Sequence, residues 1–407
     1  MSRFSVFSLI IFLSFIVFTP RVYSGELSGN VSVEARLFTE SPSSTSPITY
    51  DSQDRHNTSV ALTPEYYSET SSGAVTFTFT PFLRLDSADN NRTHFDVREL
   101  FFLKVFDEWE IGFGIRKFFW GVTESAHLVD IINQVDLVES SGGEDKLGQP
   151  MINIAVEKDF GNFDFFLMPF FRERTFPGEG GRLRPPLVVD ADLTEYQSKS
   201  EEQHVDFALR YSHYFGNWEL GLSYFYGTGR EPLLRAGLDD LGNPILIPRY
   251  IIINQGGLEL QRNAGDFIFK FEGIYRDLGS EGEEFFSTVL GLEYTLVGLF
   301  ESDADLGLIA EWLYDDRGEN SQSLMEDDIM IGLRLALNDV SGTEALLGVV
   351  EDLDSGSGFI FLESSRRFGD NIRASIEASI YSNALRDEPL STLAGEDHIR
   401  LELFYFF

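Results

Sequence analysis

Residues 397–407, DHIRLELFYFF, alternate between two kinds of side chain. Successive side chains of an extended strand point to opposite faces, so such a segment has two different surfaces. The apolar face consists of Ile399, Leu401, Leu403, Tyr405 and Phe407. The other face consists of His398, Arg400, Glu402, Phe404 and Phe406. An apolar face beside a partly charged one is typical of a transmembrane β-barrel, which has lipid outside and water inside.

The same period of two recurs in about eighteen segments of the chain. Each segment is close to the roughly 9–11 residues that a tilted strand needs to cross a membrane. The pattern predicts an all-β fold, a transmembrane antiparallel β-barrel of about 18 strands, with about 16 as the next alternative. The predicted strands are 27–38, 58–67, 74–85, 94–105, 109–120, 149–158, 162–172, 204–215, 217–228, 249–262, 266–276, 285–297, 304–314, 328–338, 344–351, 358–367, 371–381 and 397–407.

The connections between these segments are alternately short and long. Residues 106–108 and 263–265 are short links, whereas 173–203 and 229–248 are long ones. Outer-membrane barrels have short periplasmic turns and longer external loops, so the alternation predicts both termini at the periplasmic rim. Because no linker or internal repeat interrupts the pattern, residues 25–407 are predicted to form one outer-membrane β-barrel domain.

The N-terminus has the three parts of an export signal. Arg3 provides a positive charge, residues 6–18 are almost entirely apolar, and cleavage is predicted after Ser24. The alternative is an uncleaved anchor, although the apolar run is shorter than the roughly 20 residues of a spanning helix. Residues 1–24 are therefore predicted to be a signal peptide that directs the chain to the outer membrane.

Composition agrees with an exported barrel. The chain has 407 residues, 0 Cys and an aromatic content of 14%, which suits the aromatic girdles of such barrels. The net charge of −35 argues against nucleic acid as a partner, because proteins that bind nucleic acid carry basic faces. Divalent-cation binding by the acidic loops is an alternative, but Asp352–Gly356 lacks the ligand spacing of a calcium loop.

The predicted lumen carries charges of both signs. A charged side chain facing the lumen lies in water, whereas on the lipid face it would cost about 2–4 kcal/mol near the midplane. Strand alternation predicts that the following charged residues face inward: Arg116, Arg172, Arg210, Lys270, Glu272, Arg334 and Arg400. We expect these residues to line the pore.

Residues 121–148 form the third external loop in this topology, and they contain an apolar set that an exposed loop would not need. That set is Leu128, Val129, Ile131, Ile132, Val135 and Leu137. The segment is predicted to fold into the barrel as a partly helical constriction loop, with an ordered external cap as the alternative. In the first case, Asp130 and Asp136 are expected to face lumen arginines across a water-filled gap.

The same region carries a family resemblance. Arg116, Trp120, Gly121, the stretch 130–133 (DIIN) and Asp136 resemble a W-G…D-[IV]-[IV]-N-x-x-D pattern of porin-like outer-membrane proteins of proteobacteria, including barrels similar to the alginate-export family. The likeness covers roughly 25 residues. It implies a porin-like barrel. Alginate exporters use a strongly electropositive lumen, whereas the lumen predicted here is mixed, so alginate is not the expected substrate.

Four arginines lie within the start of the fourth loop: Arg172, Arg174, Arg182 and Arg184. Guanidinium groups suit the carboxylate or phosphate of a passing solute. The alternative is that they neutralise neighbouring carboxylates such as Glu173 and Glu179.

Catalytic signatures are weak. The chain contains neither a Gly-x-Ser-x-Gly elbow nor a His-Glu-x-x-His motif. His204 and Asp206 share the inward phase of a strand, which more often produces a hydrogen bond than a catalytic pair. We expect no enzyme activity, no cofactor and no metal.

These observations favour a porin-like channel for the passive diffusion of small hydrophilic or anionic solutes. The alternatives are a structural or adhesive barrel with a plugged lumen and a barrel enzyme that acts on lipid. Phe407 resembles the C-terminal signal recognised by the barrel-assembly machinery. The other expected partners are outer-membrane lipid, lipopolysaccharide and small solutes, and the oligomeric state is left open.

Overall fold

The chain forms a closed antiparallel β-barrel of 18 strands, as the sequence predicts. The computed structural model describes residues 24–41, 53–318, 321, 323, 325–382 and 389–407. The predicted signal peptide lies outside these residues, apart from the backbone of Ser24. The barrel strands are β1 (Ser24–Phe38), β2 (His56–Glu69), β3 (Val75–Asp86), β4 (His94–Val105), β5 (Trp109–Arg116), β6 (Gln149–Lys158), β7 (Gly161–Met168), β9 (Asp206–Phe215), β10 (Trp218–Thr228), β13 (Ile252–Ala264), β14 (Phe267–Asp277), β15 (Phe285–Leu296), β16 (Asp305–Asp315), β17 (Asp327–Ala336), β18 (Glu344–Asp352), β19 (Gly358–Phe368), β20 (Ile372–Ser382) and β21 (His398–Phe406).

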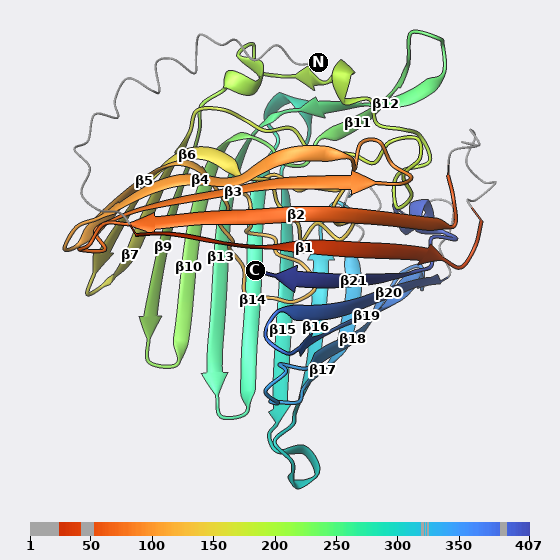
Figure 1. The fold of residues 1–407 in the computed structure, drawn as a ribbon. Helices are drawn as coiled ribbons and strands as arrows, with labels where there is room; N and C mark the ends of the chain where they lie inside the picture. The colour runs from red at the N-terminus through yellow and green to blue at the C-terminus, as the bar shows by residue number, and fades with distance from the viewer. Residues whose placement is uncertain (1–23, 42–52, 319–320, 322, 324, 383–388) are drawn as a thin grey trace.

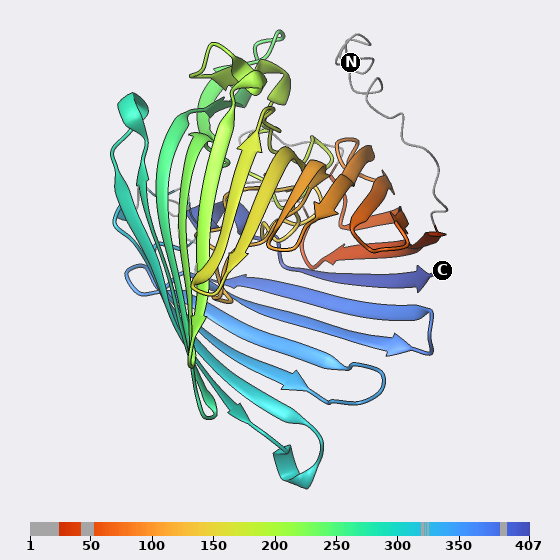
Figure 2. The ribbon, with the colours of Figure 1, turned by 90° about the vertical axis from the view of Figure 1, so that its left-hand side faces the viewer.

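Each strand pairs with its neighbours in sequence, and the first strand pairs with the last. The seam between β1 and β21 runs in register from Asn30 opposite Phe406 to Phe38 opposite His398. Figure 1 shows β1 between β2 and β21, and Figure 2 shows the tilt of the strands. Closure leaves no unpaired edge in the barrel sheet, which satisfies the backbone donors and acceptors that a membrane would otherwise leave without partners.

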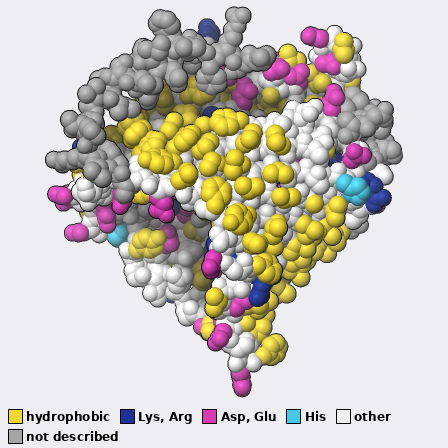
Figure 3. All heavy atoms as spheres, viewed as in Figure 1, with side chains coloured by type: hydrophobic (Ala, Val, Ile, Leu, Met, Phe, Trp, Pro, Cys, Tyr) yellow, Lys and Arg dark blue, Asp and Glu magenta, His cyan; other side chains and the backbone are white. Residues whose placement is uncertain are grey.

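The two faces of the wall differ as the period of two requires. On β17 the outward side chains of Ile329, Ile331 and Leu333 are between 38% and 49% exposed, whereas the inward Asp328 and Met330 are buried. The apolar face of β21 likewise points outward. In Figure 3, apolar side chains cover a broad area of the wall, and acidic side chains gather toward its margins. The outer surface therefore suits a hydrocarbon layer.

The connections alternate between a short-turn end and a long-loop end. Both chain ends of the barrel lie at the short-turn end, where Gly29 and Phe407 exchange two backbone hydrogen bonds of 3.1 and 3.0 Å. At the long-loop end, two loops form a small sheet of β8 (Glu195–Tyr196), β11 (Leu233–Leu238) and β12 (Pro244–Tyr250). Figure 1 shows β11 and β12 beyond the barrel strands.

Most strand boundaries differ from the sequence prediction, by up to four residues. β5 ends at Arg116 rather than at residue 120, because Trp120 leaves the wall and packs inside the barrel. β7 ends at Met168 rather than at residue 172. The predicted strand 249–262 is divided between β12 and β13. No helix in the described part of the chain is long and apolar enough to cross a membrane.

Candidate functional site

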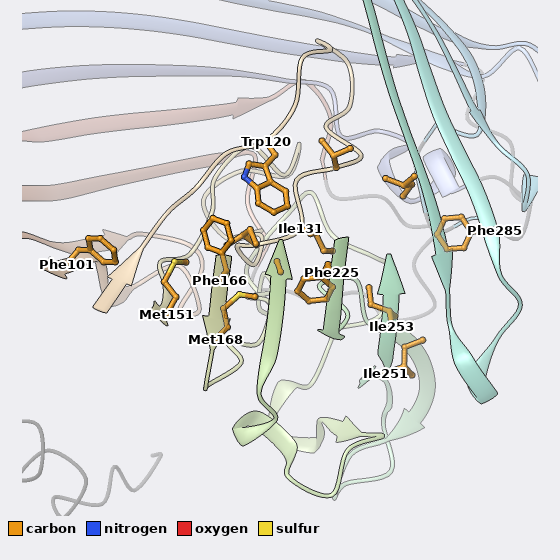
Figure 4. Close-up of a cluster of buried hydrophobic side chains, with 14 residues drawn as sticks. Phe101, Trp120, Ile131, Met151, Phe166, Met168, Phe225, Ile251, Ile253 and Phe285 are labelled. Atoms are coloured by element: carbon orange, nitrogen blue, oxygen red, sulfur yellow. The ribbon is translucent and has the colours of Figure 1, made fainter. Parts of the chain in front are cut away.

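The segment between β5 and β6 lies inside the barrel. Its apolar residues Trp120, Val129, Ile131 and Ile132 are buried against inward side chains of β4, β6, β7, β10 and β13 to β15. Figure 4 shows Trp120 and Ile131 among these wall residues. Burying each large apolar side chain is worth about 1.5–3 kcal/mol, so packing on the inner wall favours this position over one in external water.

Two buried carboxylates on the inner wall hold the first half of the segment. Glu272 of β14 accepts hydrogen bonds from the backbone nitrogens of Val122 and Thr123 at 2.6 and 3.0 Å. Glu311 of β16 accepts bonds from the backbone nitrogens of Glu124 and Ser125 at 2.8 and 2.7 Å. These bonds satisfy backbone donors that have no strand partner, so the wall fixes the path of the chain.

The approach to Glu272 also explains a glycine of the sequence pattern. Gly121 has φ of +139°, and a Cβ atom there would lie 3.0 Å from the Glu272 carboxylate. A side chain at this position would strain the backbone and crowd the carboxylate that anchors the next two residues.

Arginines on another part of the wall hold the second half of the segment. Asp136, which is fully buried, lies 2.6 Å from Arg98 of β4. Glu139 lies 2.8 Å from Arg84 of β3, and its carbonyl accepts a bond from Arg36 of β1. Charges of opposite sign on the two walls therefore hold the two halves of the same segment.

The two anchoring walls face each other. In the closed order of the barrel, seven strands separate β3 from β14 on one side and nine on the other. The segment thus crosses the lumen and returns.

The inserted segment is not partly helical, contrary to the sequence prediction. Residues 117–148 contain turns and bridges but no helix. Side-chain bonds replace helical ones: Asn133 accepts from the backbone of Phe118 and donates to the carbonyls of Arg116 and Leu147.

A dense ionic cluster lies beside the seam between β1 and β21. At its centre is Glu34, which is 1% exposed and lies 2.9 Å from Arg36, 2.8 Å from Arg92 and 2.9 Å from Arg400. Arg84 is 3.5 Å away. The sequence prediction included only Arg400 of this cluster. Completing the alternation along β1 and β3 would have found Glu34, Arg36 and Arg84, whereas Arg92 lies in the loop after β3.

The remaining predicted wall residues face the lumen, and each contacts a residue of opposite charge. Arg116 lies 3.4 Å from Glu99, and Arg210 lies 2.9 Å from Glu259. Lys270 and Arg334 share Glu293, at 3.0 and 2.9 Å. Arg334 also bonds Glu124 of the inserted segment.

The predicted gap between loop acids and lumen arginines is wrong in detail. Asp136 makes a direct ion pair with Arg98 rather than facing arginines across water. Asp130 lies 3.3 Å from Lys146 of its own segment, and burial raises the pKa of the Asp130 carboxyl. Both acids therefore hold the fold of the segment.

The arginines of the fourth loop occupy different surroundings. Arg172 lies 2.7 Å from Asp96, and Arg182 lies 2.8 Å from Glu396. Arg184 donates to the carbonyls of Gly181 and Pro185. Within the described part of the chain, the Arg174 side chain makes one hydrogen bond, of 3.4 Å, to Gln134. Carboxylates of other segments therefore neutralise Arg172 and Arg182, and backbone carbonyls bind Arg184.

One cluster of three carboxylates offers the oxygen ligands that hard cations prefer. Glu326, Asp328 and Asp352 each place a carboxylate oxygen within 4.8 Å of the others. Asp328 and Asp352 also accept hydrogen bonds from the backbone nitrogens of Glu326, Asp354 and Ser355. His204 lies 2.8 Å from Asp206, which also bonds Arg230 and the backbone of Thr228. These bonds make Asp206 part of a structural network.

Comparisons with known proteins support the fold. No protein-family model matches the chain, and no curated protein matches its sequence. A BenF-like porin from Pseudomonas fluorescens Pf-5 has a similar structure, with a TM-score of 0.53 and 10% identity over 95% of this chain and 98% of that one. OccK3 (OpdO) of Pseudomonas aeruginosa has a TM-score of 0.51 and 8% identity over 94% and 95% of the two chains. At these identities the likeness concerns the architecture of the barrel.

Proposed function

We propose that the protein is an outer-membrane channel for the passive diffusion of small hydrophilic or anionic solutes, in which residues 121–148 form the constriction. The observation that carries the proposal is the segment across the lumen, held by Glu272 and Glu311 on one wall and by Arg84 and Arg98 on the other. Barrels of 16–18 strands enclose enough space for an aqueous channel, and opposed charges beside a narrow passage select ions. The mixed charge of the wall does not favour alginate as the solute.

Single-channel recording tests the proposal. The refolded barrel should conduct in a planar bilayer, and its reversal potential in a salt gradient should give the ion selectivity. Absence of conductance from a correctly folded barrel would instead favour the structural or adhesive alternative with a plugged lumen.

Orientation can be tested because the chain has 0 Cys. Glu283 lies in a long loop and Asn217 in a short turn, and both are exposed. An impermeant maleimide should label Glu283→Cys on whole cells, whereas Asn217→Cys should react only after lysis. The parent chain, which has no cysteine, is the negative control. The opposite labelling pattern would show that the long loops face the periplasm.

Assembly is proposed to depend on the ring of Phe407. Phe407→Ser keeps the backbone bonds to Gly29 but removes the apolar end of the outward face. We expect several-fold less barrel in the outer membrane at unchanged synthesis, measured by immunoblot of cell fractions. Phe407→Leu is the matched control. Equal yields of the serine variant and the parent would refute a signal role.

A further inference from the structure

A cavity of about 260 Å³ lies between the inserted segment and the wall at the long-loop half of the barrel. Leu128 and Ile131 of the segment line it together with Ile274, Phe285 and Val289 of the wall. Pockets for drug-sized ligands usually measure about 300–1,000 Å³, so this one suits a smaller molecule with an apolar body.

The charged side chains around the cavity are almost all paired. Arg230 bonds Asp206 at 2.8 Å, Arg276 bonds Glu231 at 3.2 Å, and Arg317 bonds Asp315 at 2.6 Å. Lys146 lies 3.3 Å from Asp130. The other acid on the lining, Glu144, lies 3.7 Å from His127, and its side chain is 65% exposed to water. These pairs leave little net charge on most of the lining.

Arg174 is different. It lines the cavity, but no described carboxylate lies within 4.0 Å of it. Its Nε donates to Gln134 at 3.4 Å, and its two terminal nitrogens make no hydrogen bond among the described residues. Burial lowers the pKa of the Arg174 guanidinium, because the surroundings stabilise its charge less than water does.

The backbone at Arg174 is held firmly. Its N–H donates to the hydroxyl of Tyr250 at 2.9 Å. Tyr250 is 1% exposed, and its ring packs against Phe171 and Tyr196 with centroids 4.8 and 5.7 Å away. Because the backbone is already held, it loses little conformational entropy when the side chain binds a ligand.

We propose that this cavity is a binding subsite for a small organic oxyanion, in which Arg174 binds the charged group and the apolar lining holds the body of the molecule. The two free nitrogens of Arg174 suit two oxygens of one planar or tetrahedral anion. The subsite rests on the proposed function, since the solute would stop there before it passes the inserted segment.

Four matched probes test the subsite by calorimetry on the refolded barrel in detergent: phenylacetate, phenylmethanesulfonate, benzylphosphonate and the neutral 2-phenylethanol. At least one anion should bind roughly tenfold or more tightly than the alcohol, which corresponds to about 1.4 kcal/mol. The order among the three anions identifies the charged group.

Substitutions identify the residue responsible. Arg174→Gln should abolish the preference for the anion, and Arg174→Lys should retain part of it because the charge remains. Arg235→Gln, which changes a 49%-exposed arginine on β11, should leave binding unchanged. Equal binding of anion and alcohol by the parent, or an undiminished preference in both Arg174 variants, would overturn the subsite.

Bilayer recordings on the same preparations separate the two proposals. A barrel that conducts but shows no preference for the anion would refute the subsite and leave the channel standing. A barrel that binds the anion through Arg174 but does not conduct would refute the channel and leave the subsite as a binding site. We expect Arg174→Gln to bind poorly while its conductance stays within about twofold of the parent.

Discussion

Replacing residues 124–140 with a short Gly-Ser linker should raise single-channel conductance several-fold. These residues include the backbone donors to Glu311 and the acids paired with Arg84 and Arg98. They also contribute Val129, Ile131 and Ile132 to the apolar cluster inside the barrel. Without them the wall carboxylates and guanidiniums would face open water, so the passage would be wider and its charges better screened.

A milder substitution helps to separate the effect of channel width from the effect of wall charge on conductance. Glu311→Gln removes the charge that holds Glu124 and Ser125 while it keeps the side-chain shape. Its conductance should lie between those of the parent and the linker variant. The difference between parent and linker variant should persist in 1 M salt if width is the cause, although ion selectivity should weaken as the Debye length falls to about 3 Å. If the folded linker variant conducts like the parent, the inserted segment does not constrict the channel.

Glu34→Gln should lower the free energy of unfolding by about 3–5 kcal/mol, the cost of removing one partner from a buried ionic group. Arg36, Arg92 and Arg400 all lie within 2.9 Å of Glu34 and would lose the carboxylate that they share. Asp86 would still pair with Arg92, and Glu377 and Glu402 with Arg400, but no other described carboxylate lies within 4.0 Å of Arg36. Denaturant titration of the barrel, followed by tryptophan fluorescence, measures the change.

An exposed ion pair is the control for that experiment. Glu195→Gln breaks the 3.3 Å contacts with Arg235 and Arg249, where the Glu195 side chain is 46% exposed. Such pairs contribute about 0–1 kcal/mol, so the unfolding midpoint should hardly move. Equal midpoints for Glu34→Gln and the parent would show that the cluster beside the seam does not stabilise the barrel.

The architecture was predictable because period-two alternation is a local property of the chain. The face of Ile329, Ile331 and Leu333 follows from their spacing alone, and repeated spacing predicts eighteen strands. The small sheet at the long-loop end was not predicted. Its strand β12 contains Pro244 and Pro248, and proline argues against a strand because it lacks a backbone donor.

The partners inside the lumen were not predictable in the same way. Alternation predicts the face of the strand on which Arg210 lies. Whether Arg210 reaches Glu259 depends on their positions along the barrel axis, which are set by the register of β9, β10 and β13. The path of the inserted segment depends on carboxylates from strands more than a hundred positions later, such as Glu272 and Glu311. The apolar composition of the segment predicted that it would be buried, but not which part of the barrel wall it would pack against.

The cluster around Glu34 has a consequence for the order of folding. Arg400 and Glu34 are 366 positions apart in the chain, and Arg36 and Arg84 also hold Glu139 of the inserted segment. Until β21 reaches β1, Glu34 lacks Arg400, and moving an incompletely paired cluster out of water is costly. We expect seam closure and docking of the segment to occur together in a late step, and contacts between such distant positions make that step slow.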